Sequence, residues 1–222
     1  MDCAAIIVAA GSSSRMGFDK LTADLAGVPV LQRSLDTLAA TGLFEEIVIV
    51  TSQDRFATLT PPDLPVQQVE GGRERHLSVV EGLGALTTTP ELVAIHDGAR
   101  PLVRGEMISR CLHAAKEHGA ATLARRVTET IKKASEHGFT KGTIPRENLW
   151  VMETPQSFRT ATLQRAYEGI IRENITVTDD VSAVETIGIP AFLVENPFPN
   201  PKITLPGDLA VAAAILRDYK SS

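Results

Sequence analysis

Two cations near the start of the chain could hold an anionic group. Residues 4–20 read AAIIVAAGSSSRMGFDK: an apolar run ends at Gly11, three serines follow, and Arg15 and Lys20 complete one short loop. Glycine and serine let a backbone approach a phosphate closely, and an arginine and a lysine neutralise its charge. The apolar run predicts a buried strand, and backbone N–H groups beyond a strand end can bind an anion. The segment is therefore a candidate nucleotide site.

The same loop fits neither of the two common phosphate-binding motifs. Counting from Gly11, Met16 stands where the second glycine of a P-loop belongs, and Ser13 stands where a dinucleotide fingerprint requires glycine. Short motifs of this kind also match by chance. On these residues alone, a phosphate loop and a plain Ser/Gly turn with two solvated cations are equally good explanations.

A second group of chemically capable residues follows another apolar run. Asp97 follows the apolar run 92–95 and His96, at a strand end where a carboxylate can bind a metal–phosphate complex or accept a substrate hydroxyl. A turn or N-cap role would explain Asp97 as well. Arg100 can pair with Asp97 or contact a substrate anion, and His96 is a packing residue rather than a catalytic one. Lys202, far along the chain, is by default a surface lysine.

Strands and helices alternate through the first half of the chain. Apolar runs predict strands at 46–51, 66–69 and 92–95, and helices are expected at 30–40, after Gly71-Gly72, and at 105–118. Such alternation predicts an α/β fold with a mainly parallel sheet covered on both faces. Because ligands bind beyond the carboxyl ends of parallel strands, the loops 11–20, 71–78 and 96–101 are expected to meet there.

The pattern changes near Gly119. Residues 120–133 look extended with alternating polar positions, a turn follows at 136–138, and 139–144 returns, which predicts a two-stranded arm at about 124–153. The arm is too polar for the core, so it should pack on another subunit or form a lid on its own chain. Beyond it we expect helices at 160–171, 181–187 (with Thr178-Asp179-Asp180 as its N-cap) and 208–218, and strands at 191–194 and 202–204.

Composition restricts the class of protein. The 222 residues fit a single domain, 1–222, with 43% hydrophobic content, and the formal net charge of −5 argues against a general nucleic-acid binder. Cys3 and Cys111 have no paired spacing, which indicates reduced thiols in a cytoplasmic protein. The apolar start reads as a first strand rather than a signal peptide, and no run approaches the length of a membrane span.

Seven stretches taken in order are more specific than any one of them. They are AAGSSSRMG, GGRERHLSV, HDGARP, ETIK, TPQSF, TDDVSAVE and NPKIT, and they extend over nearly the whole chain. With them the sequence resembles the 2-C-methyl-D-erythritol 4-phosphate cytidylyltransferase family of non-mevalonate isoprenoid biosynthesis. The resemblance implies a single nucleotidyltransferase-type (Rossmann-like) domain in a homodimer that exchanges the β-arm. It also implies transfer of CMP from CTP to a phosphorylated sugar alcohol, with release of pyrophosphate and a divalent ion, usually Mg²⁺.

The resemblance also implies roles for individual residues. The family's catalytic cations correspond to Arg15, Lys20 and Lys202. Its CTP pocket corresponds to Ala9, Ala10, Gly11, Gly72, Ser78 and Gly98. Its sugar-phosphate site corresponds to Asp97, Arg100, Thr130, Arg146, Thr154, Thr178 and Lys202, with Thr130 and Arg146 donated by the arm of the partner subunit.

Some features of the chain depart from the family pattern. Ser13 replaces the second glycine of the usual Gly-x-Gly-x-Arg-Met, and the segment from Arg15 to Lys20 is shorter and lacks a proline. Two other functions stay open at this point. One is a cytidylyltransferase for a different polyol phosphate, such as ribitol 5-phosphate, and the other is a non-catalytic nucleotide-binding protein.

Overall fold

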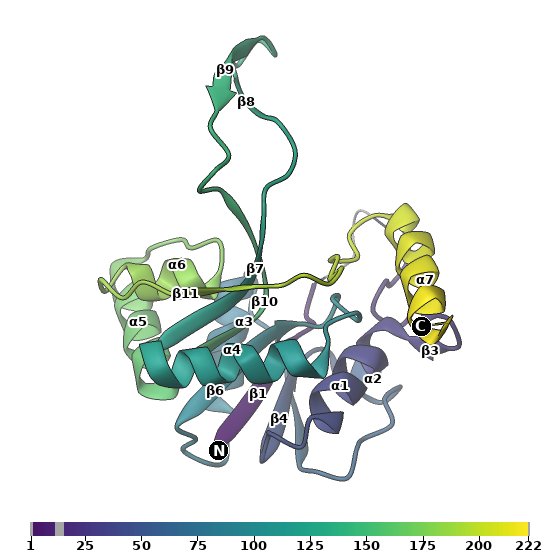
Figure 1. The fold of residues 1–222 in the computed structure, drawn as a ribbon. Coiled ribbons are helices and arrows are strands. Elements are labelled where there is room, and N and C mark those ends of the chain that lie inside the picture. Colours follow the sequence, from purple (N-terminus) through teal and green to yellow (C-terminus); the bar gives the residue numbers. More distant parts are fainter. Residues whose placement is uncertain (1, 12–15, 222) are drawn as a thin grey trace.

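The computed structural model describes residues 2–11 and 16–221. Its centre is a seven-stranded sheet in the order β11-β7-β10-β6-β1-β4-β5 (Figure 1). The strands are β1 (Cys3–Val8), β4 (Glu46–Val50), β5 (Val66–Val69), β6 (Leu92–Asp97), β7 (Ala120–Arg126), β10 (Trp150–Arg159) and β11 (Phe192–Glu195). Neighbours are parallel except that β10 runs antiparallel to β6 and β7. The predicted α/β fold with a mainly parallel sheet is confirmed.

Helices cover both faces of the sheet because successive strand residues point to opposite sides. In β1, Ile7 packs with α1 (Val30–Ala40), α4 (Gly105–His118) and α7 (Pro206–Ser221). Ile6 packs on the other face with α3 (Arg75–Gly84), α5 (Thr160–Glu173) and α6 (Asp180–Glu185). The short helix α2 (Gln53–Phe56) and the pair β2 (Asp24–Leu25) and β3 (Val28–Pro29) complete this part of the fold.

The main sequence-based elements agree with the structure, although the short elements α2, β2 and β3 were not predicted. Helices at 30–40 and 105–118 and the strand at 66–69 have the predicted bounds. The strand predicted at 202–204 is wrong, since these residues form an irregular segment held by Ile203 N–H, which donates to the Ala99 carbonyl at 2.9 Å. Strand β10 was not predicted, although it lies in the middle of the sheet. It accommodates Pro155 because its pairing with β7 shifts register between Met152 and Gln156.

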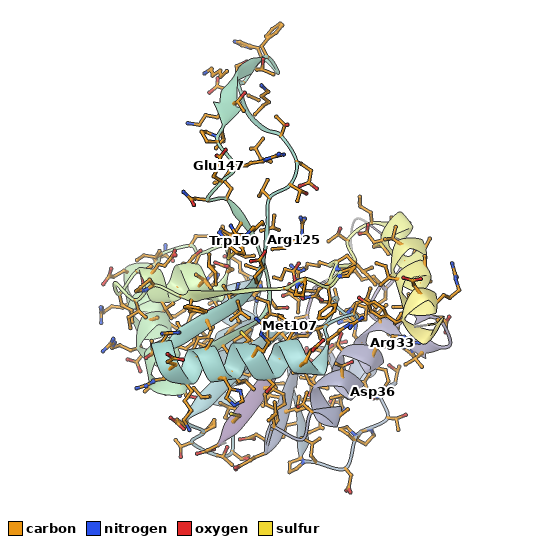
Figure 2. The ribbon with its side chains drawn as sticks, viewed as in Figure 1. Arg33, Asp36, Met107, Arg125, Glu147 and Trp150 are labelled. Atoms are coloured by element: carbon orange, nitrogen blue, oxygen red, sulfur yellow. The ribbon has the colours of Figure 1, made fainter. Side chains whose placement is uncertain are left out.

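A hairpin arm extends from the sheet where β7 and β10 continue beyond it (Figure 1). It ends in the two-stranded pair β8 (Ile131–Ala134) and β9 (Thr140–Ile144), whose residues are mostly exposed. Arg125 and Trp150 mark the base of the arm, and Glu147 lies further out along it (Figure 2). The arm connects β7 to β10, and its part in a dimer stays a prediction. Among the described residues, no helix is long and apolar enough to cross a membrane.

Candidate functional site

A cavity of about 450 Å³ opens beyond the carboxyl ends of β1 and β6. The three loops that were predicted to meet there all contribute to its lining, through Gly11 and Lys20, Gly72 and Ser78, and Asp97. Lys202 and Thr204, from the irregular segment before α7, close another side. The cavity therefore combines residues nearly two hundred positions apart in the sequence.

The end of β1 forms one wall of the cavity, with Ala9, Ala10 and Gly11 in the lining. Ala9 N–H donates to the Val50 carbonyl at 2.8 Å, and the Ala9 carbonyl accepts from Arg55 Nη1 at 2.6 Å. Arg55 also pairs with Asp19 at 2.8 Å. These contacts hold the backbone of the predicted nucleotide loop against β4. Arg15, predicted as a catalytic cation, lies outside the described residues.

The Gly71-Gly72 pair permits a close approach of two backbones. A Cβ atom on Gly71 would lie 2.2 Å from the Ala10 Cβ, and one on Gly72 would lie 2.4 Å from the Leu77 Cβ. Neither distance is possible for a real side chain. A larger residue at position 71 would therefore collide with the β1 loop, and one at position 72 would collide with the first turn of α3. Ser78 Oγ donates to the Glu74 carbonyl at 3.2 Å inside the first turn of α3.

Gly98 lies behind the cavity rather than in its lining. Its N–H donates to the Val8 carbonyl at 3.0 Å, and its carbonyl accepts from Ser34 Oγ at 3.0 Å. A Cβ at this position would meet the Leu31 Cδ1 at 2.7 Å. In the structure Gly98 therefore packs β6 against α1, and its contact with a nucleotide stays a prediction.

Asp97 is the centre of the charged part of the site. Its Oδ2 lies 2.8 Å from Lys202 Nζ and 3.6 Å from Arg100 Nε, and its Oδ1 lies 3.3 Å from Arg75 Nε. Burial alone would raise the pKa of Asp97, but the positive charges of Arg75, Lys202 and Arg100 outweigh it and hold that pKa well below its usual range. Asp97 is therefore a carboxylate at neutral pH, and a simple turn role does not describe it.

Arg75 and Asp180 belong to this charged group and were not predicted. Arg75 Nη2 lies 2.8 Å from Asp180 Oδ2, and the fully buried Asp180 accepts the Tyr167 hydroxyl at 2.5 Å. Arg75 is the first residue of α3, Asp180 the first of α6, and Asp97 the last of β6. The alternation of β6 places Asp97 on the same face as Ile95, which faces these two helices.

Lys20 contacts the irregular segment before α7. Its Nζ donates to the Ile203 carbonyl at 2.8 Å, which ties the β1 loop to the segment that carries Lys202. Both lysines line the cavity. The structure thus brings together two of the three predicted catalytic cations, and the shortened loop still lets Lys20 reach the cavity.

The remaining predicted sugar-phosphate residues lie in three different places. Thr154 and Arg100 lie behind Asp97: Thr154 Oγ1 accepts from Asp97 N–H at 3.0 Å, and Arg100 Nη1 donates to the Asn200 carbonyl at 2.8 Å. Thr178 is exposed beside the start of α6, with its hydroxyl 3.1 Å from Ser182 Oγ. Thr130 and Arg146 are exposed on the arm, and Arg146 donates to the Thr128 carbonyl. Within one chain, the arm residues do not line the cavity.

His96 is locked in a neutral form next to Asp97. Its Nε2 lies 3.2 Å from the Arg100 carbonyl, which can only accept, so Nε2 carries the proton and Nδ1 accepts from Thr154 Oγ1 at 3.1 Å. Burial lowers the pKa of His96 to about 4. The side chain is therefore a structural support rather than an acid or base, as the sequence indicated.

Acid should destabilise the protein through His96. The unfolded chain protonates this residue below about pH 6.5, whereas the folded chain does so only below about pH 4. Between these values the unfolded state binds more protons, so the free energy of unfolding should fall by about 3 kcal/mol as the pH drops. Urea unfolding at pH 7 and pH 4.5 measures this loss. His96→Gln should lose less stability over that interval, and a loss equal to that of the wild type would contradict the prediction. The exposed His137→Gln is the matched control.

Comparisons with known proteins agree with the geometry. The chain matches the family model described as IspD: 2-C-methyl-D-erythritol 4-phosphate cytidylyltransferase over residues 3–218. It is 38% identical to the protein of that name from Pelotomaculum thermopropionicum, covering 96% of this chain and 94% of the relative. It is 40% identical to the one from Geobacillus kaustophilus, with 97% of each chain covered.

The fold is also similar to solved structures. The 2-C-methyl-D-erythritol 4-phosphate cytidylyltransferase of Thermus thermophilus has a TM-score of 0.82 at 31% identity, with 98% of this chain and 100% of that chain covered. The 4-diphosphocytidyl-2C-methyl-D-erythritol synthase of Anaerococcus prevotii has a TM-score of 0.84 at 29% identity, with 97% and 98% covered. From the family match over nearly its full length and these relatives, the chain belongs to the 2-C-methyl-D-erythritol 4-phosphate cytidylyltransferase family.

Proposed function

We propose that this chain transfers the cytidylyl group of CTP to 2-C-methyl-D-erythritol 4-phosphate, giving the CDP-alcohol and pyrophosphate. The observation that carries the proposal is the cavity at the carboxyl end of the sheet, which Lys20 and Lys202 both line together with Gly11 and Gly72. Fixed positive charge of this kind stabilises phosphates whose charge shifts during transfer.

The reaction needs no general base from the protein. A phosphate monoester oxygen of the alcohol substrate is already anionic near neutral pH, and it forms a bond to the α-phosphorus of CTP. The bond from that phosphorus to the bridging oxygen breaks in line, and its electron pair leaves with pyrophosphate. The site fits such a mechanism, because His96 is neutral with both ring nitrogens engaged, and burial raises the pKa of the Cys111 thiol to about 12. Catalysis rests on alignment and charge stabilisation.

Each cation has a proposed role in that displacement. Lys20, together with Arg15, acts on the triphosphate and the leaving pyrophosphate. Lys202 acts on the α-phosphate and on the phosphate of the incoming alcohol. Ala9, Ala10, Gly11, Gly72 and Ser78 form the wall that binds the nucleotide, largely through backbone groups. Asp97 orients Lys202 and can accept a hydroxyl of the alcohol.

A divalent ion, Mg²⁺ by preference, would enter with the nucleotide. Among the described residues there is no cluster of three His, Cys, Asp or Glu side chains that could hold a metal by itself. Mg²⁺ commonly keeps several waters and binds through one or two carboxylates plus substrate phosphates. Two carboxylates line the cavity, Asp97 and Glu74, and Asp97 is the one that ends the buried strand β6. In this proposal Asp97 would hold the ion together with substrate phosphates. The ion would neutralise triphosphate charge when bound.

The arm supplies the rest of the alcohol site in this proposal. Thr130 and Arg146 extend from the body of their own chain, so a homodimer in which each arm reaches over the other subunit would bring them to the cavity. Reduced, buried Cys3 and Cys111 are in keeping with a cytoplasmic enzyme.

Pyrophosphate release tests the proposal directly. With CTP, Mg²⁺ and 2-C-methyl-D-erythritol 4-phosphate, we expect turnover that is at least about tenfold more efficient in kcat/KM than with ribitol 5-phosphate, because a site that hydrogen-bonds one polyol leaves polar groups unpaired with another. Higher efficiency with ribitol 5-phosphate would identify a different polyol specificity. CTP binding by calorimetry without turnover of either alcohol would identify a non-catalytic nucleotide-binding protein.

A further inference from the structure

Arg75 bridges two carboxylates that come from different parts of the fold. Its Nε faces Asp97 Oδ1 at 3.3 Å, and its Nη2 faces Asp180 Oδ2 at 2.8 Å. The Asp180 side chain is fully buried and the Arg75 side chain is 25% exposed, so the guanidinium separates the interior from the cavity that it lines. Burial would lower the pKa of Arg75, but Asp180 and Asp97 raise it, so the bridge stays charged.

The charges of this cluster leave one cation in surplus. Arg75, Arg100 and Lys202 face the carboxylates Asp97 and Asp180, which gives a net charge of one positive unit. Tyr167, which donates to Asp180, is neutral because burial and the Asp180 charge raise its pKa far above its usual value. Without Lys202, the two arginines would still neutralise the two carboxylates.

Lys202 is the cation of this cluster that can turn away from Asp97. Its side chain is 38% exposed, compared with 13% for Arg100. Arg100 is also held by the Asn200 carbonyl at 2.8 Å, whereas a lysine carries a point charge on a flexible four-carbon stem. When Lys202 turns away, Oδ1 of Asp97 keeps Arg75 and Oδ2 keeps Arg100.

We propose that Arg75 is a positioning residue: by neutralising Asp97 and Asp180 together, it frees Lys202 to act on a substrate phosphate. This inference rests on the proposed function, in which Lys202 acts on a substrate phosphate. Without Arg75, Asp180 would be a buried charge with no cation in contact, and Arg100 and Lys202 would be the two cations left to balance the two carboxylates. Lys202 could then not turn away without leaving the cluster with a net negative charge. The positive charge available to the substrate would then be lost although Lys202 is present.

A charge-balanced double variant tests this role. Arg75→Gln should lower kcat about 30-fold, and Arg75→Gln with Asp180→Asn should return kcat to within about threefold of the wild type, because the net charge is restored and the two amides can hydrogen-bond. The double variant decides the question even if Arg75→Gln alone fails to fold. A double variant that folds but remains as slow as Arg75→Gln would overturn the proposal and assign Arg75 to direct substrate contact. The exposed Arg172→Gln is the control.

A second measurement separates positioning from a merely structural role. In protein that already carries Lys202→Ala, adding Arg75→Gln and Asp180→Asn together should change kcat less than about threefold. Adding Arg75→Gln alone should also lower kcat only slightly, because Arg75 acts through the amine that Lys202→Ala has removed. Full additivity of the Arg75→Gln and Lys202→Ala losses would contradict the proposal.

Binding of inorganic phosphate, the group that Lys202 is proposed to contact, gives a readout by calorimetry that needs no turnover. Its affinity should fall about tenfold in Arg75→Gln and recover in the double variant, because the net charge of the cavity follows the same order. If the wild type releases no pyrophosphate from CTP, the proposed function fails, while this binding series still decides the role of Arg75. Equal affinity in all three proteins would overturn that role.

Discussion

Lys202→Ala should lower kcat by about 10²–10³-fold, equivalent to about 3–4 kcal/mol in the barrier. The amine is the most exposed cation around Asp97 and the one that the charge balance leaves available to phosphate. Its loss removes an interaction that strengthens as charge moves between the two phosphates in the transition state. Steady-state pyrophosphate release with both substrates saturating measures the effect.

The fold should survive this substitution. Asp97 and Asp180 retain Arg75 and Arg100, so Lys202→Ala leaves no carboxylate without a cation. We therefore expect the melting temperature to stay within a few degrees of the wild type, in line with surface changes of at most about 0.5 kcal/mol. Lys116→Ala, which removes an exposed lysine paired with Glu91 at 3.5 Å, is the control for both measurements. Turnover near the wild-type rate in Lys202→Ala would remove this lysine from the mechanism.

The sequence was sufficient to predict the parallel part of the sheet and the edge at which the site forms. Alternation of apolar runs and helices identified the parallel core, and parallel strands bring their carboxyl ends to one edge, so Gly11, Gly72 and Asp97 had to lie close together. Strand β10 was not predicted, because polar residues and a proline such as Pro155 are not typical of a strand in the middle of a sheet. It can occupy that place through a register shift that no local pattern reveals.

The network around Asp97 could not be read from sequence for a different reason. Arg75 and Asp180 are 105 positions apart, and each has an adequate local explanation, one as a helix-start cation and the other as an acid in a first helical turn. Their contact depends on how α3 and α6 pack on the same face of β6. Lys202 was recognised from its motif, but the strand expected around it was wrong, because Ile203 is held by single hydrogen bonds to Ala99 and Lys20 rather than by a ladder.

If each arm reaches over the other subunit, a heterodimer of two slow variants should regain activity. Arg146→Ala removes the arm arginine, which is exposed in the single chain, and should lower kcat about 10²-fold on its own. Lys202→Ala removes the body lysine. In a heterodimer of the two variants, the arm of the Lys202→Ala chain would meet the cavity of the Arg146→Ala chain, and that site would have every residue. Co-expression with two affinity tags and sequential purification gives the heterodimer, whose activity should be about half that of the wild type.

The geometry of the arm makes this experiment decisive. If each arm instead folded over the cavity of its own chain, every site of the heterodimer would carry either Arg146→Ala or Lys202→Ala, and activity would not be regained. The same reasoning supplies the control, since Lys20 and Lys202 line the cavity of one chain. A heterodimer of Lys20→Ala and Lys202→Ala should therefore stay inactive. If the first heterodimer regains activity and the second does not, Arg146 acts across the subunit boundary. If neither purified heterodimer regains activity, the arm acts on its own chain.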